Sequence, residues 1–377
     1  MAHVYTPGLK VTERTLVRKE RRLPLNGEVL VNQGQTVKGE DIVARTSLPG
    51  DVTTVNVAGL LGVPAEDVKG LMLKKVGDPI NKDEILAQSK GFFGLFKSTV
   101  KSPITGTVES ISDITGQVIL REAPRPVEVT AYIDGVVSEI FPNQGVAIET
   151  EASLIQGIFG IGGETRGEII VVIDNPAQPL TRQDIDESCK GKIVVGGSIV
   201  DFETLQWARE VGAKGVVVGG IEDATLKKFL GYDIGVAITG SEKTGITLMI
   251  TEGFGKMRMA DHTFALLKSL TNKTASMNGA TQIRAGVIRP ELIVPLDSKK
   301  VSSEQTKKSS SMDVGLQIGS LVRVIREPNF GMIGKVVSLP VELTEIETES
   351  KVRILELELE DGKRVFLPRA NVEIIEK

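Results

Sequence analysis

Residues able to carry out acid–base or metal chemistry are scarce in this 377-residue chain, which has two histidines, His3 and His262, and one cysteine, Cys189. His262 is the candidate general base, because imidazole titrates near neutral pH and Glu252 and Asp261 lie nearby in sequence. A single histidine at the start of a helix is more often a surface residue, and no Ser–His–Asp or Cys–His arrangement is indicated. Two histidines and one cysteine cannot form a zinc site of the usual nitrogen and sulfur kind. We therefore expect no catalytic residue, no metal and no cofactor, and we lean against an enzyme.

Anion binding by backbone amides is a second chemistry that the sequence allows. Continuous apolar runs that alternate with helices are typical of a small α/β layer with parallel strands. The runs are Ile169–Ile173, Lys192–Val195, Gly215–Val218 and Val236–Thr239, and the expected helices are Val200–Val211 and Asp223–Leu230. Ligands of such layers bind at the carboxyl ends of the strands, where helix N-termini attract phosphate or carboxylate groups. The candidate anion site comprises Gly196, Gly197, Ser198, Gly219, Gly220, Thr239 and Gly240.

These glycines also have a simpler explanation, which we favour: they make short turns after the strands. The Gly-rich segment 151–166 offers further amides, but no Walker lysine follows it and its spacing is not that of a dinucleotide fingerprint. We interpret that segment as a connector.

Composition describes an ordinary globular protein, with 41% hydrophobic and 25% charged residues. A net charge of −4 gives no general attraction to nucleic acid or to an anionic membrane. A single cysteine excludes an intrachain disulfide and suits a reducing compartment. The N-terminal sequence MAHVYTPGLK lacks an apolar signal-peptide core, and no run approaches 18 apolar residues. We expect a cytoplasmic protein that does not span a membrane.

The sequence contains an internal repeat. Gly34–Ala44 (GQTVKGEDIVA) matches Gly77–Ala87 (GDPINKDEILA) in pattern along its length. The exception is the second glycine of the first copy, which corresponds to Lys82 in the second copy. Strands that begin Gly-x-Val follow at Gly50, Gly106 and Gly135. Recurring glycines indicate tight turns between short strands, and alternating Val and Ile indicate strands that bury one face.

This pattern resembles the barrel-sandwich hybrid, the fold of lipoyl and biotinyl carriers that also occurs in RnfC-type subunits. The resemblance covers residues 23–150 and implies a β-rich domain. Carriers present a modified lysine at a hairpin tip, but here Lys90 and Lys97 only flank the tip and neither has the sequence context of a carrier. The fold is shared by unrelated functions, so it does not indicate one.

The tip itself is apolar where a carrier would have its lysine. It contains Phe92, Phe93, Leu95 and Phe96 within the segment GFFGLF. Exposed side chains of this kind are costly for a soluble protein, so we expect a partner, another domain or a second copy to cover them. The alternative is contact with a lipid surface.

Other segments complete the organisation of the chain. Residues 1–22 form a basic arm, for which a solvated strand or terminus is favoured over a polyanion contact. Residues 167–296 hold the α/β layer, which resembles swivelling modules. Residues 297–315 are rich in Ser and Lys and are expected to be a flexible linker.

Residues 316–377 resemble the KOW motif of NusG-family factors, which implies an SH3-like barrel. Gly319 opens a strand, Gly331 and Gly334 supply a turn, and Val322, Val324 and Val336 alternate into the expected core. KOW modules contact RNA or protein, and the candidate contact patch comprises Arg323, Arg326, Phe330 and Lys335. Acidic residues outnumber basic ones in this segment, and a phosphate contact needs clustered positive charge. A protein partner is therefore favoured over RNA.

Together these observations predict a multidomain, β-rich α+β protein. The favoured function is a non-enzymatic adaptor or scaffold that works through protein contacts or self-association, with attachment to transcription or translation machinery through the KOW domain as a special case. Two alternatives stay open. One is a subunit of an enzyme or carrier complex that binds an anionic metabolite in the α/β domain. The other is a peripheral membrane or envelope adaptor that uses the GFFGLF hairpin.

Overall fold

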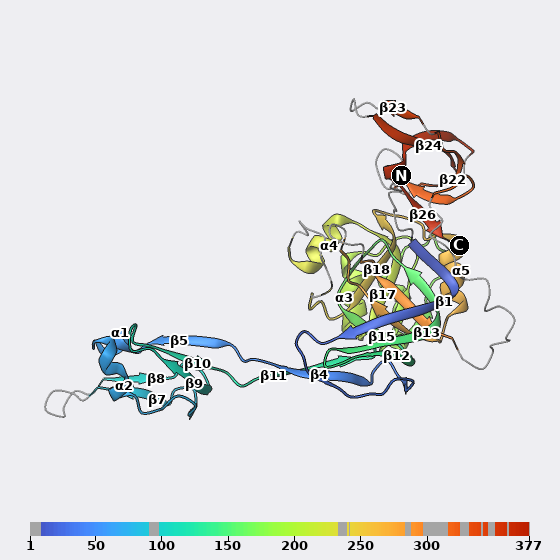
Figure 1. Cartoon of the computed structure of the whole chain (residues 1–377). Helices are drawn as coiled ribbons and strands as arrows, with labels where there is room; N and C mark the ends of the chain where they lie inside the picture. Colours follow the sequence, from blue (N-terminus) through green and yellow to red (C-terminus); the bar gives the residue numbers. More distant parts are fainter. Residues whose placement is uncertain are drawn as a thin grey trace.

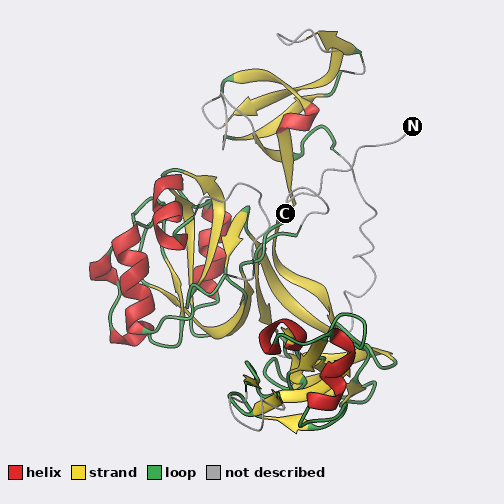
Figure 2. Ribbon diagram, turned by 90° about the vertical axis from the view of Figure 1, so that its left-hand side faces the viewer, coloured by secondary structure: helices red, strands yellow, loops and turns green. Residues whose placement is uncertain are grey.

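The computed structural model describes residues 9–89, 98–232, 240, 242–282, 288–296, 316–324, 332–340, 342–345, 351–359 and 362–376. The protein is β-rich, with a small α/β part, as expected from the sequence. Figure 1 shows a central body, a pair of strands that extends from it and ends in a small module, and a C-terminal β-domain. In the view turned by 90°, the small module and the C-terminal β-domain lie on different sides of the body (Figure 2).

In the α/β part of the body, the described residues form four parallel strands in the order β15 (Glu164–Val171), β16 (Ile193–Val195), β17 (Gly215–Ile221) and β18 (Thr247–Phe254). A short strand, β14 (Phe159–Ile161), joins β18 antiparallel. Continuous apolar sequence suits these strands because both faces of the sheet are covered. Helices α3 (Phe202–Val211) and α4 (Asp223–Leu230) cover one face, as expected from their apolar spacing. Helix α5 (Asp261–Ser269) packs into the core on the other face.

Strand β18 was not among the strands expected from the sequence. The fourth parallel strand of the described structure is β18, whose residues from Thr247 to Gly253 are all buried, whereas the expected strand Val236–Thr239 lies outside the described residues. Gly215 pairs with Thr247 and Gly220 pairs with Gly253, so β18 lies next to β17 in the sheet.

A second sheet of the body is built around β13 (Gly145–Gln156). This strand pairs with β1 (Leu9–Arg22) along one edge. Its other edge pairs first with β12 (Gly135–Phe141) and then with β20 (Glu291–Pro295), which is followed by β19 (Thr274–Asn278). Strand β15 pairs with both β19 and β16 and so joins the two sheets.

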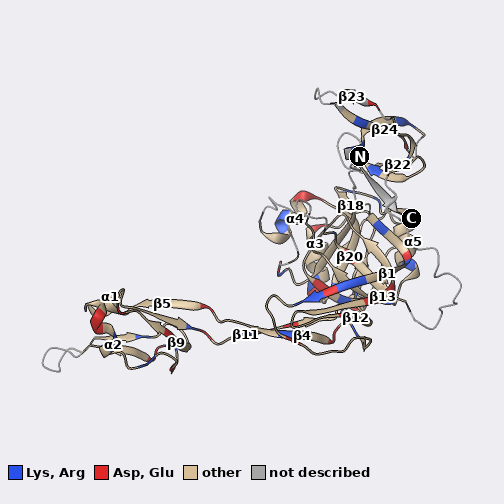
Figure 3. Ribbon diagram, in the orientation of Figure 1, with Lys and Arg blue, Asp and Glu red and all other residues tan. Residues whose placement is uncertain are grey.

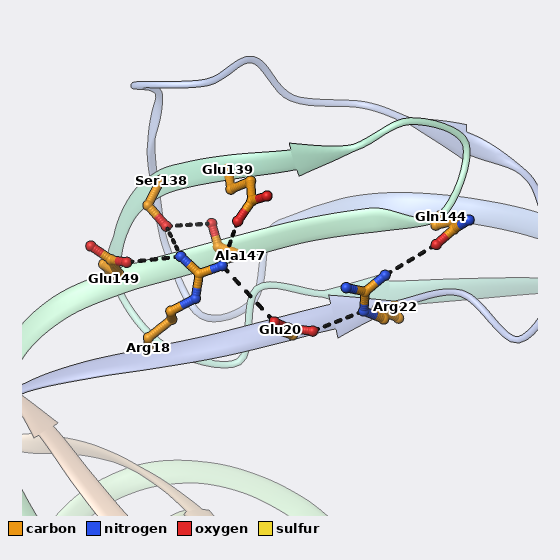
Figure 4. A network of polar contacts seen from close by, with 8 residues as sticks. All are labelled: Arg18, Glu20, Arg22, Ser138, Glu139, Gln144, Ala147 and Glu149. Atoms are coloured by element: carbon orange, nitrogen blue, oxygen red, sulfur yellow. Dashed lines mark hydrogen bonds and ion pairs between the residues drawn. The ribbon is translucent and has the colours of Figure 1, made fainter.

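The basic arm is part of this sheet from Leu9 onward. Basic and acidic residues lie along β1 and its neighbouring strands (Figure 3), and Figure 4 shows Arg18 beside Glu139 and Glu149 of β12 and β13. Arg18 contacts Glu139 at 2.5 Å and Glu149 at 3.1 Å through its two terminal nitrogens. Residues 9–22 form a strand, and its Arg14, Arg18, Arg21 and Arg22 each contact a glutamate within the chain.

Residues 23–150, expected as one domain, have two separate cores. The proximal module is part of the body and consists of residues 17–22 of β1, β2 (Glu28–Val29), β3 (Thr36–Val37), β4 (Ile42–Leu48), β11 (Arg125–Thr130), β12 and the start of β13. The distal module spans residues 52–121 and has its own buried cluster. Its elements are β5 (Val52–Asn56), α1 (Val57–Leu61), the 3₁₀ turn η1 (Ala65–Asp67), α2 (Val68–Leu71), β6 (Pro79–Ile80), β7 (Ile85–Gln88), β8 (Thr99–Lys101), β9 (Gly106–Ile111) and β10 (Gln117–Arg121).

The two modules are copies of one structure, which confirms the repeat. The turn glycines Gly34 and Gly77 both have positive φ, at 82° and 93°. Gly34 N–H donates to Val137 O at 2.8 Å, and Gly77 N–H donates to Val108 O at 2.7 Å. Further equivalent pairs are Leu30 N to Val43 O and Leu73 N to Leu86 O, Ala131 N to Asp41 O and Ser102 N to Glu84 O, and Lys38 N to Asp41 Oδ2 and Asn81 N to Glu84 Oε2. The β4–β11 and β7–β8 hairpins also share a one-residue register shift at the same place.

One copy is inserted into the other. The β4–β11 hairpin of the proximal module ends where Leu48 pairs with Arg125, and the whole distal module replaces its turn. The equivalent hairpin of the distal module, β7–β8, ends at Gln88 and Thr99. The paired strands β4 and β11 thus form a stalk that holds the distal module away from the body (Figure 1).

We expect the body to fold without the distal module. Replacement of residues 49–124 by Asn-Gly would close the β4–β11 hairpin with a two-residue turn of a kind that hairpins favour. The free energy of unfolding of the body should change by no more than about 1 kcal/mol, since its core contains no distal residue and loop length has a weak effect. Urea unfolding of the shortened and full chains checks this. Loss of the body transition in the shortened chain would contradict it.

The C-terminal β-domain is a five-stranded antiparallel sheet with one further short strand. Its order is β25 (Arg364–Pro368), β24 (Lys351–Leu359), β22 (Ile333–Ser338), β21 (Leu321–Val324) and β26 (Val372–Glu376), and β23 (Leu343–Glu345) pairs with β24. Val322, Val324 and Val336 are buried in its core, as the alternation predicts. The last strand also pairs in parallel with the start of β1, through Leu9 with Ile375 and Lys10 with Glu376.

Candidate functional site

Backbone atoms of the chain itself lie against three glycines of the predicted anion site. A Cβ atom on Gly197 would lie 2.1 Å from Gln178 O, and one on Gly219 would lie 2.1 Å from Met257 O. A Cβ on Gly220 would lie 2.0 Å from Gly255 O. These glycines are needed because two loops, at residues 174–180 and 255–259, cross the carboxyl end of the sheet in backbone contact with it.

Three of the amides that were expected to bind an anion form hydrogen bonds within the fold. Gly196 N–H donates to Val217 O, Ser198 N–H to Gln178 O, and Gly219 N–H to Gly197 O. The hydroxyl of Ser198 donates to Ala177 O at 2.8 Å. The simpler explanation of the glycines, as residues of tight local geometry, therefore accounts for this end of the sheet.

Gly240 does not join the other glycines. It lies at the opposite end of the sheet, beside Ala280, and its N–H donates to Glu242 Oε2 at 2.8 Å. The same carboxylate oxygen accepts a hydrogen bond from Gly162 N–H at 3.0 Å. The anion that these amides bind is thus a side chain of the protein. Thr239 lies outside the described residues.

The hairpin-tip residues Phe92, Phe93, Leu95 and Phe96 lie outside the described residues, as do Arg326 and Phe330 of the C-terminal patch. Two members of that patch are described, and they differ. Lys335 on β22 is exposed, whereas Arg323 on β21 is 3% exposed.

Arg323 is buried because it binds the body. Its Nη1 donates to the carbonyl oxygens of Thr251 and Glu252 at 3.2 and 3.1 Å, and its Nη2 contacts Glu252 Oε2 at 2.5 Å. Glu252 lies near the carboxyl end of β18, and its other oxygen accepts from Ala260 N–H at 3.1 Å. Glu252, considered beside His262 as a catalytic group, is therefore an interdomain ion-pair residue.

A second guanidinium lies near this ion pair. The pKa of Arg289 is lowered to about 10, because burial disfavours its charge and the guanidinium of Arg323 repels it. Among the described residues, the contact between the C-terminal β-domain and the body therefore contains the Arg323–Glu252 ion pair and a second buried guanidinium near it.

Sequence reasoning missed a polar cluster where the proximal module meets the rest of the body. Lys19 Nζ contacts Glu291 Oε1 at 2.5 Å, and Arg21 forms two hydrogen bonds with Glu164, at 2.6 and 2.7 Å. Tyr132 lies between them, with its hydroxyl 3.5 Å from Glu291 Oε1 and a φ of 69°. Burial and the nearby carboxylates of Glu291 and Glu164 raise the pKa of Tyr132 well above its usual value. These residues join strands far apart in sequence, so spacing along the chain gave no signal.

Asp134 extends this contact. It accepts hydrogen bonds from Gly39 N–H and from Arg166 Nη2, both at 2.7 Å. Burial opposes its ionisation, but the hydrogen bonds from Arg166 and Gly39 outweigh burial and lower its pKa below 3.8. The cluster of charged pairs fixes the proximal module on the body, and nothing in its geometry resembles a nucleophile beside a base.

We expect Asp134→Asn to destabilise the body by about 1–2 kcal/mol at pH 7, less than a fully buried charged hydrogen bond because the carboxylate is partly exposed and screened. A lowered folded-state pKa gives stability that is present above the unfolded-state pKa and is lost as pH falls through the folded-state value. The difference between wild type and variant should therefore be constant from pH 8 to about 5 and shrink below about pH 4. Urea unfolding at several pH values measures it, with exposed Asp174→Asn as control. A difference that does not depend on pH would exclude this role.

The other reactive residues lie apart. His262 is exposed on the first turn of α5, and Cys189 is buried in the helix-covered core. In the part of the chain that the structure describes, no group of three or more His, Cys, Asp or Glu residues could hold a metal ion. Among the same residues, no helix is both long and apolar enough to cross a membrane.

Comparison with known proteins assigns no family. No protein-family model matches the chain, and no curated protein matches its sequence.

Proposed function

We propose that the chain is a non-enzymatic adaptor that acts through protein–protein contacts, with the distal module as its main contact element. The observation that carries this proposal is the nested insertion, in which the β4–β11 stalk holds a complete second module away from the body. A module in this position adds nothing to the core of the body, so its presence calls for a role outside the chain.

Exposed apolar side chains on the distal module support the same role. Leu60, Leu73, Val76 and Ile114 are all more than half exposed, and Ile114 is 91% exposed. Apolar exposure on one small module is a feature of surfaces that bind partners. The distal module also lacks the charged residues that fix its copy on the body, since Thr53, Val55 and Pro103 stand where the proximal module has Lys19, Arg21 and Tyr132.

We also propose a specific fold for each module and for the C-terminal β-domain. The duplicated hairpins and their glycine turns favour a barrel-sandwich hybrid for each module, and the buried alternation of Val322, Val324 and Val336 favours a KOW-like SH3 barrel for the C-terminal β-domain. On this proposal the protein works in a reducing compartment such as the cytoplasm, its partner is a protein or a second copy, and RNA is the less favoured ligand.

Affinity purification from the native host tests the adaptor function. We compare the full chain with the chain in which Asn-Gly replaces residues 49–124, and with a Leu60→Ser/Ile114→Ser variant. Proteins captured by the full chain should be lost with the shortened chain and reduced with the double variant. Equal capture by all three chains would remove the distal module from the function, and flotation of the full chain with liposomes but not of the shortened chain would favour the membrane alternative.

A further inference from the structure

Arg323 occupies a position that a free C-terminal β-domain would expose. Its neighbours along β21, Val322 and Val324, point into the core of that domain. Successive side chains of a strand point to opposite faces, so Arg323 points away from the core. Its 3% exposure results from the body, which covers it with Thr251 and Glu252.

The groups that bind Arg323 show which chemistry this face recognises. The guanidinium binds one carboxylate and two successive backbone carbonyls, all from the end of a single strand. A planar guanidinium with five donors suits such a set, and a lysine does not. Two of the three acceptor oxygens are peptide carbonyls, which a polynucleotide lacks in this arrangement.

We propose that the Arg323 face of the C-terminal β-domain is a binding face for an acidic, extended segment of a partner protein, and that Thr251–Glu252 of the body occupies this face as an internal competitor. The proposal rests on the adaptor function and names the chemistry of a second partner contact. It does not involve the distal module, so the two proposals fail separately.

The contact between the domains is suited to competition. A buried ion pair regains only part of the cost of removing two charges from water. Arg289 lies near Arg323, and its pKa is lowered by burial first and by repulsion from Arg323 second. Strand β26 of this domain also pairs with β1 of the body, but over two residues only. A partner that supplies its own glutamate therefore replaces an equivalent interaction rather than breaking one without compensation.

Competition makes a quantitative prediction. A ligand of the open state has an apparent affinity reduced by the fraction of molecules that are open. Glu252→Gln removes the charge of the competitor and keeps an oxygen that can accept from Ala260 N–H. This variant should bind an acidic strand peptide at least about tenfold more tightly than wild type does.

The test uses the full chain and a fluorescent peptide that contains Ile-Thr-Glu-Gly between soluble flanks, with Ile-Thr-Gln-Gly as the matched control. We expect tight binding of the Glu peptide to Glu252→Gln, weaker binding to wild type, and none to Glu252→Gln/Arg323→Gln. Small-angle scattering of Glu252→Gln should show a larger radius of gyration than that of wild type, and addition of the Glu peptide should keep it large, because the peptide binds the open state. Binding that is the same for Glu and Gln peptides, or that is unchanged between wild type and Glu252→Gln, would overturn the proposal, and so would tighter binding of single-stranded RNA than of the Glu peptide.

A charge exchange keeps the proposal testable if the single variant does not fold. Glu252→Arg with Arg323→Glu restores an ion pair of opposite direction between the two domains. This double variant should have the compact scattering profile of wild type and should prefer an Ile-Thr-Arg-Gly peptide over the Glu peptide. An unchanged preference for the Glu peptide would show that residue 323 does not read the ligand.

Discussion

Leu86→Ala is expected to destabilise the distal module by about 2–5 kcal/mol and to leave the unfolding of the body unchanged. Leu86 is fully buried on β7, within a cluster made only of distal residues. Removal of its side chain loses transfer free energy and leaves a cavity, because the surrounding residues relax only in part. The stalk transmits little of this loss, since the body has separate cores.

Val43→Ala is the matched control, because Val43 is the equivalent residue of the proximal module and is also fully buried. It should lower the unfolding transition of the body and leave that of the distal module in place. Hydrogen exchange followed by mass spectrometry of peptides resolves the two modules in the full chain. If either substitution changes protection in both modules to the same extent, the modules are not independent units.

Gly219→Ala is expected to destabilise the body by about 3 kcal/mol or more, because overpacking against backbone cannot be relieved by rotating a side chain. The new Cβ would lie 2.1 Å from Met257 O and 3.0 Å from Met259 N. Gly219 lies on β17, next to β18 in the parallel sheet. The loop at residues 255–259 would therefore have to move away from β17.

Gly70→Ala is the control for this substitution. Gly70 lies in α2, where a Cβ would meet nothing within 4 Å, and the replacement should be neutral or stabilising by up to about 1 kcal/mol. Thermal unfolding of both variants, with and without inorganic phosphate, compares the two explanations of the strand-end glycines. Normal stability of Gly219→Ala, together with a phosphate-dependent rise in the melting temperature of wild type, would favour an anion site over the packing explanation of these glycines.

The repeat could be predicted from sequence because its determinants are local. Gly34 and Gly77 each adopt a left-handed conformation that favours glycine, and Asp41 and Glu84 each bind an amide three residues earlier in the chain. Such local interactions produce a sequence pattern with fixed spacing. The insertion of one copy into the other produces no such pattern, because it depends on the pairing of Leu48 with Arg125 across the whole distal module.

Arg323 shows the same limit at the candidate site. Alternation along the strand predicts that its side chain leaves the core of the C-terminal β-domain, and the structure agrees. Whether an outward residue meets solvent or another domain depends on contacts with Glu252, which lies in a different part of the chain. Gly196 and Gly197 directly follow β16, and Gly219 and Gly220 lie near the carboxyl end of β17, but the loops that cover them, at residues 174–180 and 255–259, come from other parts of the chain.

The nested insertion also has a consequence for the order of folding. The distal module is continuous in sequence, whereas the two halves of the proximal module are separated by residues 49–124. Closing so long a loop in an unfolded chain costs entropy before any contact forms, and such long-range pairing slows folding. Once the distal module is folded, its two ends lie together and bring Leu48 close to Arg125. The inserted copy therefore acts as a template for the stalk that carries it, and the proximal module is expected to form second.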